Sequence, residues 1–342
     1  MADLESAATL KRLSDYLTNA LSFTGPILVR KFAGGQSNPT YKVTASDQTC
    51  VLRRKPEGAL LKSAHAVDRE FLVQKALEGS GVPVARMIHY CADPDIIGSE
   101  FYLMEYVEGR IFGEPALPEM QSEHRAAVFR EMCQVLASIH SVDLAQSGLE
   151  EYGPPGDFFE RQLSRWTRQY RASETETLPA MDELIAALSA ALPASDGQRT
   201  LVHGDYRIDN LVFASNAPTC RAVLDWELST AGHPFADLAG VIMQWRMPPG
   251  QEGRGLAGID RRAHGAPTDA EFIETYCKLR RIDGIENWGF YLAFSFFRMA
   301  AIIQGVKRRA LDGNASNPEK GLRLGEHVPM FAQHGLKALL DG

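Results

Sequence analysis

Three polar residues follow one another at fixed spacing between short apolar runs in the second half of the chain. Asp205 comes after Leu201-Val-His-Gly, Asn210 lies five residues further on, and Asp225 closes the next apolar run. A carboxylate can orient and deprotonate an incoming hydroxyl, while an amide oxygen and a second carboxylate are oxygen ligands suited to Mg²⁺. The spacing therefore favours phosphoryl transfer from a nucleotide over a capped turn in a surface hairpin.

The composition is that of an ordinary globular protein. The chain has 342 residues, of which 45% are hydrophobic, and a net charge of −7. This length suggests about two domains, and the acidic balance gives no basic footprint for nucleic acid or anionic membranes. The N-terminus lacks the layout of a signal peptide, and no apolar run approaches the roughly 18 residues that span a bilayer. Five scattered cysteines without a Cys-x-x-Cys pair indicate reduced thiols. We therefore expect a cytoplasmic protein with no nucleic-acid or membrane partner.

The first hundred residues alternate short strands with tight turns. Leucines at helical spacing predict a leading helix over residues 4–21, and a second helix is expected over 64–78. Five strands are predicted, at 26–32, 40–44, 49–53, 86–92 and 100–107, the last two joined by the turn-rich stretch 92–95. Such a series forms a small antiparallel sheet.

The pattern changes to helical after Gly109. Six helices are expected, over 119–141, 157–172, 179–192, 269–281, 286–309 and 318–340. The only strand candidates are the short runs 200–202, 211–213 and 221–224, and residues 247–268 read as a long loop. The sequence thus predicts an α+β, bilobal protein-kinase-like fold. Residues 1–107 would form the small antiparallel β-sheet N-lobe, and 108–342 the mainly helical C-lobe.

Several motifs along this layout are those of one known family. They are Gly34-Gly35-x-Ser37-Asn38, Val51-Leu-Arg53, Arg69-Glu70-Phe71, Met104-Glu-Tyr-Val-Glu-Gly109, His203-Gly-Asp205 and Asp225-Trp-Glu227. Together they resemble the aminoglycoside phosphotransferase-like (protein-kinase-like) family over nearly the whole chain. The resemblance is strongest to the branch fused to, or found beside, acyl-CoA dehydrogenases.

The resemblance implies how a nucleotide would be held. The turn with Gly34 and Gly35 would cover the phosphates of ATP, because glycine lets a backbone approach a phosphate closely. Ser37 would add a hydroxyl contact. Backbone groups near Glu105 and Val107 would take the adenine edge, although a buried edge strand explains the same residues.

The third strand should carry a cation for the nucleotide phosphates. Arg53 occupies the position that the resemblance assigns to lysine, and Glu70 on the following helix is its natural partner. Lys55 lies two residues on and would face the same side if the strand continued. Pro56 ends the strand, so Arg53 is favoured and Lys55 stays an alternative.

We assign roles to the residues of the expected catalytic loop from the chemistry of their side chains. Asp205 is the expected base or orienter of the acceptor hydroxyl, and Asn210 and Asp225 are the expected ligands of Mg²⁺. Arg207 sits where protein kinases place a lysine near the transferring phosphate, with a surface salt bridge as the alternative.

Three neighbouring residues have roles that are less sharply defined. His203 is favoured as a structural hydrogen-bonding residue, and Asp237 fits the buried aspartate that steadies the catalytic loop in this family. Glu227 could either touch a second metal ion or lie on the surface.

The expected activity is ATP- and Mg²⁺-dependent phosphorylation of a hydroxyl on a small molecule. The resemblance suggests a hydroxyacyl-CoA or related metabolite, and a functional association with an acyl-CoA dehydrogenase. Four arginines in the segment 244–268 could meet an anionic substrate or simply solvate a loop: Arg246, Arg254, Arg261 and Arg262.

Two alternatives stay open. The first is an aminoglycoside or amino-alcohol kinase of the choline or homoserine type, and the second is a nucleotide-binding pseudokinase or scaffold. Residues 253–258 satisfy Gly-x-Gly-x-x-Gly but follow a Pro-Pro-Gly loop rather than a strand, so dinucleotide binding is rejected. The histidines show no zinc-ligand spacing.

Overall fold

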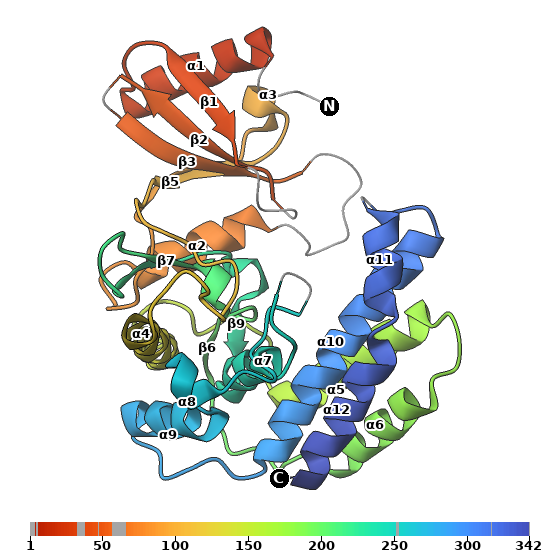
Figure 1. Cartoon of the computed structure of the whole chain (residues 1–342). Coiled ribbons are helices and arrows are strands. Elements are labelled where there is room, and N and C mark those ends of the chain that lie inside the picture. Colours follow the sequence, from red (N-terminus) through yellow and green to blue (C-terminus); the bar gives the residue numbers. More distant parts are fainter. Residues whose placement is uncertain are drawn as a thin grey trace. The chain divides into compact units, whose positions relative to one another are not determined.

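The structure is a computed structural model, shown in Figure 1. It describes residues 4, 6–32, 38–46, 48–56, 66–250, 253–315 and 317–341. The chain divides into two compact units. The first takes the described residues of Met1–Phe112, Gln146–Leu149 and Asp209–Ser229, and the second those of Gly113–Ala145, Glu150–Ile208 and Thr230–Gly342. The expected boundary between residues 107 and 108 stays a prediction.

A five-stranded antiparallel sheet forms the centre of the first unit, in the order β1-β2-β3-β5-β4. Its strands are β1 (Ile27–Lys31), β2 (Thr40–Ala45), β3 (Gln48–Arg54), β4 (Met87–Cys91) and β5 (Phe101–Glu105). The register places Arg53 opposite Thr40 on one side and Tyr102 on the other. Strand β3, which carries the expected cation, is therefore the central strand.

Helices cover both faces of this sheet. Helix α1 (Ala7–Leu21) packs Leu13 and Leu17 into one cluster of buried strand residues. Helix α2 (Val67–Leu77) places Val67 against a second cluster, which holds Val51 of β3 and Tyr102 of β5. The alternation of β-strand side chains makes this division, because successive residues point to opposite faces.

A β-hairpin completes the first unit. It consists of β7 (Leu211–Phe213) and β8 (Cys220–Val223), preceded by a 3-10 turn (Ile208–Asn210) and followed by another (Trp226–Leu228). Arg110 exchanges backbone hydrogen bonds with Phe213, which ties the chain after β5 to the hairpin. Gly109 permits this close approach, because a Cβ there would lie 2.3 Å from the carbonyl oxygen of Phe213.

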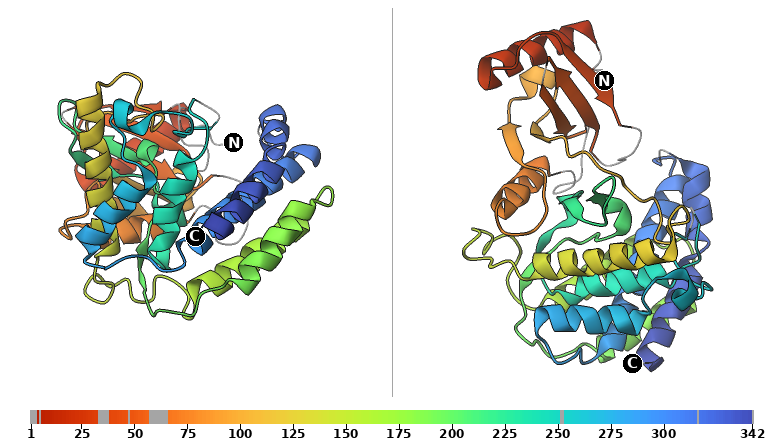
Figure 2. Two further views of the ribbon diagram at one scale, coloured as in Figure 1. Left: turned by 60° about the horizontal axis from the view of Figure 1, so that its bottom comes forward. Right: turned by 60° about the vertical axis from the view of Figure 1, so that its left-hand side comes forward.

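The second unit is mainly helical. Its helices are α4 (Ser122–His140), α5 (Phe158–Ser173), α6 (Pro179–Ala190), α7 (Phe235–Trp245), α8 (Arg261–His264), α9 (Asp269–Arg280), α10 (Trp288–Leu311), α11 (Pro318–Gly325) and α12 (Val328–Asp341). Strands β6 (Thr200–Val202) and β9 (Thr230–Gly232) form a two-stranded sheet. Figure 2 shows α4, α7 and α9 beside one another, and the ring of Trp245 on α7 contacts Phe129 of α4 and Phe272 of α9.

Four local expectations need correction. Helix α7 and strand β9 are additional elements, the short helix α8 lies within the expected loop 247–268, and the short helix α3 (Pro94–Ile97) overlaps the expected turn at 92–95. Helix α7 begins directly after Pro234 and contains Gly240 in its interior, a residue that lowers helix propensity. The other three elements have only three or four residues each, too few to show a period.

The expected helix over 318–340 is two helices, because α11 ends at Gly325 and α12 begins at Val328. Pro329 is the second residue of α12, and proline is favoured in a first helical turn but breaks a helix interior. The absence of a side chain at Gly325 also lets the chain approach Lys307 of α10 closely.

Helix α10 is the core of its helical layer and packs against α5, α7, α11 and α12. Within the described part of the chain, it alone is long and apolar enough to cross a membrane, which the sequence expectation had not allowed for. However, 72% of its most apolar window is buried inside the structure, as in the core helix of a globular domain.

The close approach at Gly109 predicts a stability difference between two glycines. Gly109→Ala should lower the free energy of unfolding by about 1–3 kcal/mol, because the new methyl group must push against a backbone carbonyl. Gly113→Ala is the control, since a Cβ there meets nothing within 4 Å, and its effect should stay within about 0.5 kcal/mol. Chemical denaturation measures both, and equal effects would contradict the assigned packing.

Candidate active site

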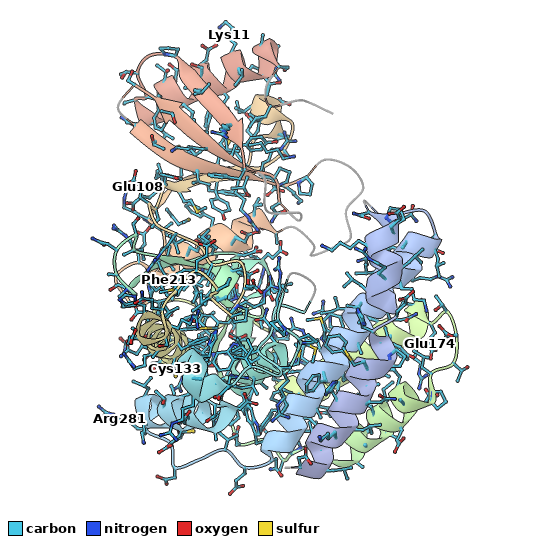
Figure 3. The ribbon with its side chains drawn as sticks, viewed as in Figure 1. Lys11, Glu108, Cys133, Glu174, Phe213 and Arg281 are labelled. Carbon is cyan, nitrogen blue, oxygen red and sulfur yellow. The ribbon has the colours of Figure 1, made fainter. Side chains whose placement is uncertain are left out.

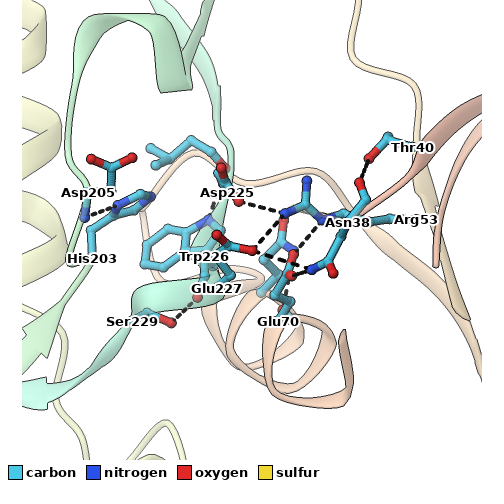
Figure 4. A network of polar contacts seen from close by, with 12 residues as sticks. Asn38, Thr40, Arg53, Glu70, His203, Asp205, Asp225, Trp226, Glu227 and Ser229 are labelled. Atoms are coloured by element: carbon cyan, nitrogen blue, oxygen red, sulfur yellow. Dashed lines mark hydrogen bonds and ion pairs between the residues drawn. The ribbon is translucent and has the colours of Figure 1, made fainter. Parts of the chain in front are cut away.

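A single guanidinium holds together three carboxylates in the first unit (Figure 4). The Nε atom of Arg53 lies 2.8 Å from Glu70 Oε2, and its Nη2 atom lies 2.6 Å from Asp225 Oδ1. The same Nη2 atom is 3.7 Å from Oε2 of Glu227. We call these four residues and Asn38 the Arg53 cluster. Arg53 of β3 thus joins α2 to the turn after β8, and Asn38, from the segment before β2, donates hydrogen bonds to Glu70 and Glu227.

Glu70 is the most buried carboxylate of the Arg53 cluster, with a side chain only 1% exposed. Its Oε1 atom accepts a hydrogen bond of 2.6 Å from Nδ2 of Asn38, and its Oε2 atom accepts one of 3.0 Å from the Tyr102 hydroxyl. A buried charge is tolerated when it is paired and hydrogen-bonded in this way. Glu70 is therefore fixed in position before any ligand arrives.

The electrostatics of the cluster keep Arg53 charged. Burial acts against the charge, but the surrounding carboxylates, Glu70 foremost, raise the pKa of the Arg53 guanidinium above its ordinary value. Three carboxylates facing one guanidinium leave an excess of negative charge. Such a group favours a further cation.

Lys55, the alternative cation, lies in a different environment. Strand β3 ends at Arg54, and the Nζ atom of Lys55 pairs with Glu100 Oε1 at 3.0 Å. This ion pair is about one-third exposed on both sides. The structure thus brings Arg53 together with Glu70 and Asp225, and places Lys55 beside Glu100. Which of the two cations contacts phosphates stays a prediction.

The hairpin brings the two expected metal ligands to one end. Leu211 pairs with Val223, and the N–H of Leu224 donates to the carbonyl of Asn210, so Asn210 lies opposite Leu224, the residue that precedes Asp225. Asp225 has a φ of 63°, in the left-handed region that few residues other than glycine adopt. Backbone strain of this kind is concentrated at functional sites.

The donor set at this end of the hairpin fits Mg²⁺. A carboxylate and an amide oxygen are hard ligands, and Mg²⁺ is usually bound by one or two carboxylates together with substrate phosphates and water. Within the described residues, no group of three or more His, Cys, Asp or Glu side chains could hold a metal by itself. The arrangement therefore suits a cation that arrives with a nucleotide better than a permanent structural metal.

The catalytic loop belongs to the second unit up to Ile208. The backbone N–H of Asp205 donates to Nδ1 of His203, which is fully buried, in agreement with a structural role for this histidine. Gly204 has a φ of +85°, a conformation that glycine adopts without strain. Arg207 lies with its Nε atom 3.2 Å from Oδ1 of Asp205, and both side chains are partly exposed.

Asp237 of α7 anchors the catalytic loop through its backbone. Its Oδ2 atom accepts a hydrogen bond of 2.6 Å from the N–H of His203, and its Oδ1 atom one of 2.8 Å from the N–H of Gly204. Although burial alone would raise it, the contact with His140 helps to hold the pKa of Asp237 below its usual value. Arg298 of α10 donates to the carbonyl of Gly204 at 2.8 Å. The backbone beside Asp205 is therefore held on both sides.

Only some of the residues that are expected to contact the nucleotide belong to the described part of the chain. Gly34, Gly35 and Ser37 lie outside the described residues. The N–H of Glu105, at the end of β5, donates to the carbonyl of Arg86, so any adenine contact at Glu105 would use its own carbonyl. Val107 follows two residues later and is half-buried. Their roles remain predictions.

Two arginines of the segment 244–268 have structural partners. Arg246 and Arg261 both pair with Asp269, at 3.0 and 3.4 Å, and Arg261 also stacks over the ring of Trp245. Arg262 instead lines a cavity of about 780 Å³ between α4 and α9, to which Arg130 also contributes. Solvation of a loop is therefore not the role of Arg246 or Arg261.

Sequence reasoning gave no role to three residues that shape the site: Asn38, Tyr102 and Arg298. Asn38 belongs to a quoted motif, but its bond to Glu70 depends on how the chain enters β2. Tyr102 could have been found from the strand register, because it lies directly across from Arg53. Arg298 lies in the helix expected over 286–309, and as a buried charged residue it needs a partner, which is the carbonyl of Gly204.

Comparison with known proteins supports the family resemblance. The model of the phosphotransferase enzyme family matches residues 28–281. Acyl-CoA dehydrogenase family member 10 of Mus musculus is 48% identical over 308 residues, which cover 89% of this chain and 29% of the mouse protein. Member 11 of the same organism is 43% identical over 339 residues, covering 96% of this chain and 43% of that protein. The chain thus spans less than half the length of these relatives.

Solved structures confirm the expected α+β, protein-kinase-like fold. A protein from Ralstonia eutropha JMP134 assigned as an aminoglycoside phosphotransferase has a TM-score of 0.88 at 42% identity, covering 97% of this chain and 98% of that one. The aminoglycoside phosphotransferase APH(4)-Ia, solved with AMP-PNP and hygromycin B, has a TM-score of 0.65 at 13% identity, covering 97% and 99%. The latter likeness shows the fold alone.

The burial of the Arg53–Glu70 pair predicts unequal effects of one substitution at two cations. Arg53→Met should lower the free energy of unfolding by about 3–5 kcal/mol, because it leaves Glu70 buried without its counter-charge. Lys55→Met is the matched control and should cost at most about 1 kcal/mol, because its pair with Glu100 is partly exposed.

Urea denaturation measures both losses. Adding Glu70→Gln to Arg53→Met should recover part of the stability, because the unpaired buried charge is then removed. Similar small losses for the two methionine variants would show that the Arg53–Glu70 pair is not buried in solution.

Proposed function

Because the chain belongs to the phosphotransferase enzyme family, we propose that it transfers the γ-phosphoryl group of ATP to a hydroxyl group of a small molecule. The observation that carries the proposal is the Arg53 cluster beside the hairpin. It presents a charged guanidinium, a strained Asp225 and the neighbouring Asn210 in one unit. These are the groups that phosphoryl transfer requires for binding phosphates and a divalent cation.

ATP and Mg²⁺ are the proposed nucleotide and metal. The solved complex of APH(4)-Ia with AMP-PNP supports a nucleotide of this kind. Asn210 and Asp225 would hold Mg²⁺, which when bound neutralises charge on the phosphates. Arg53 would contact the phosphates, since its planar fork suits their oxygens. Gly34, Gly35, Ser37, Glu105 and Val107 keep the nucleotide roles predicted from the sequence.

Asp205 would carry the proton transfer. Its carboxylate accepts the proton of the acceptor hydroxyl as that oxygen attacks the γ-phosphorus, and ADP leaves with the electrons of the broken bond. The contacts of Asp237 with the backbone of His203 and Gly204 would hold Asp205 in the required position. Arg207, at 3.2 Å from Asp205, can orient its carboxylate and stabilise charge on the transferring group.

A hydroxyacyl-CoA or a related carboxylic-acid metabolite is the proposed acceptor. This choice of acceptor is supported by two relatives that are more than 40% identical to this chain and are named acyl-CoA dehydrogenase family members. A hydroxyl is a poor leaving group, and its phosphorylation would prepare the substrate for elimination. A functional association with an acyl-CoA dehydrogenase follows from the same argument. We place the activity in the cytoplasm, where the five free, buried cysteines would stay reduced.

An aminoglycoside or amino alcohol is the second candidate acceptor. It is favoured by the Ralstonia eutropha protein, which is 42% identical to this chain and assigned as an aminoglycoside phosphotransferase. A pseudokinase or scaffold role is a less favoured alternative, because Asp205, Asn210 and Asp225 are all present.

The role of Asp205 predicts a separation of binding from turnover. Asp205→Asn should lower kcat by about 10²–10⁴-fold, because the hydroxyl loses its proton acceptor. Binding of Mg²⁺–ATP should change little, because Arg53, Asn210 and Asp225 stay intact. Steady-state kinetics and calorimetry measure the two quantities. A variant with unchanged kcat would remove Asp205 from the mechanism.

The acceptor class is tested by an ATP-consumption screen with Mg²⁺ and Asp205→Ala as the blank. The panel contains hydroxyacyl-CoAs, aminoglycosides and amino alcohols. We expect turnover with a hydroxyacyl-CoA, with a phosphorylated product visible by mass spectrometry, and none in the blank. Turnover only with an aminoglycoside or amino alcohol would favour the second acceptor class. Tight ATP binding without any turnover would favour the pseudokinase role.

A further inference from the structure

Arg53 and Mg²⁺ compete for one carboxylate. Asp225 Oδ1 is the partner of Arg53 Nη2 at 2.6 Å, and Asp225 is also the proposed metal ligand. Two cations that share one carboxylate repel each other. Asp225 therefore becomes a weaker partner for the Arg53 guanidinium once Asp225 binds the metal. The Nη2 atom of Arg53 then needs another partner if Arg53 is to stay aligned with the phosphates.

The structure provides that contact in Glu227. Its Oε2 atom lies 3.7 Å from the same Nη2 atom of Arg53, and its side chain is only 19% exposed. A carboxylate at this distance and burial can become the main partner of Nη2 after a small movement. The Nε atom of Arg53 keeps its 2.8 Å contact with Glu70 throughout.

Asn38 connects the two carboxylates that would remain. Its Nδ2 group donates to Glu70 Oε1 at 2.6 Å and to Glu227 Oε2 at 3.5 Å, and the residue is fully buried. Its own carbonyl accepts a hydrogen bond of 2.9 Å from the Thr40 hydroxyl, which fixes its position at the start of β2. One amide thus sets the spacing between Glu70 and Glu227, the two carboxylates that contact Nε and Nη2 of Arg53 (Figure 4).

We propose that Asn38 and Glu227 are positioning residues that keep Arg53 aligned for the nucleotide phosphates while Asp225 is engaged by the metal. This inference rests on the proposed function. It goes beyond that function because neither residue needs to touch the nucleotide or the metal. The pair matters most in the metal-bound state, since Asp225 also holds Arg53 in the metal-free state.

The proposal predicts a loss of coupling between metal and nucleotide. We define the coupling as the dissociation constant of ATP with EDTA divided by that with saturating Mg²⁺, both measured by calorimetry on the full chain. In Asn38→Ala and in Glu227→Gln the metal-free constant should stay within about threefold of wild type, while the Mg²⁺–ATP constant should rise about tenfold. A merely structural defect would weaken both constants equally and leave the coupling unchanged.

Tyr102→Phe is the matched control, because it removes the other neutral donor of Glu70 without touching Glu227. It should shift both constants by the same factor. The double variant Asn38→Ala/Glu227→Gln should lose no more coupling than Glu227→Gln alone, since the two residues form one anchor. Asn38→Ser, which keeps a hydroxyl but shortens the reach to Glu227, should lose less and replaces Asn38→Ala if that variant does not fold.

The outcomes separate this inference from the proposed function. If wild type binds ATP with Mg²⁺ but Asn38→Ala and Asn38→Ser keep full coupling, the anchor is overturned. Loss of coupling in Glu227→Gln alone would also overturn it, because Glu227 would then be a direct metal ligand. If wild type binds no ATP under either condition, the proposed function itself fails, and the anchor fails with it.

Discussion

The guanidinium of Arg53 is the interaction on which the first unit depends. It is nearly buried, yet it is shared among Glu70 of α2, Asp225 and Glu227 of the turn after β8. Removing water from so many charges is costly, and the cost is offset only because each carboxylate has a partner. The position of the Arg53 guanidinium also determines where the negative charge of a nucleotide could be paired. Structure and proposed chemistry therefore depend on one ion-pair network, whereas much of the rest of the side-chain packing serves the fold (Figure 3).

In the second unit, a short loop carries the partly exposed carboxylate of Asp205. Asp205 is partly exposed, so its own side chain supplies little rigidity. The rigidity comes from the backbone, because Asp237 accepts hydrogen bonds from the consecutive N–H groups of His203 and Gly204, and Arg298 donates to the carbonyl of Gly204. Charged, buried partners make hydrogen bonds of this kind strong.

The sequence was sufficient for most elements and for the pairing of Arg53 with Glu70. Period-two alternation, however, could not decide between Arg53 and Lys55, since both would face the same side of a continuing strand. The end of β3 at Arg54 separates them. Helix α7 was not predicted, because Pro234 directly precedes it and Gly240 lies in its interior, and β9 was not predicted because three residues show no period. Asn38 and Tyr102 gain meaning only from the register of β2, β3 and β5, which is a tertiary property.

Arg53 should change partners between the ligand-free and the nucleotide-bound states. This exchange is tested by a crystal structure of the protein with Mg²⁺ and a non-hydrolysable ATP analogue. We expect Asp225 and Asn210 on the metal, and Arg53 on the phosphates while still in contact with Glu70 and Glu227. A structure in which Lys55 holds the phosphates, or in which Asp225 remains on Arg53 and away from the metal, would contradict it.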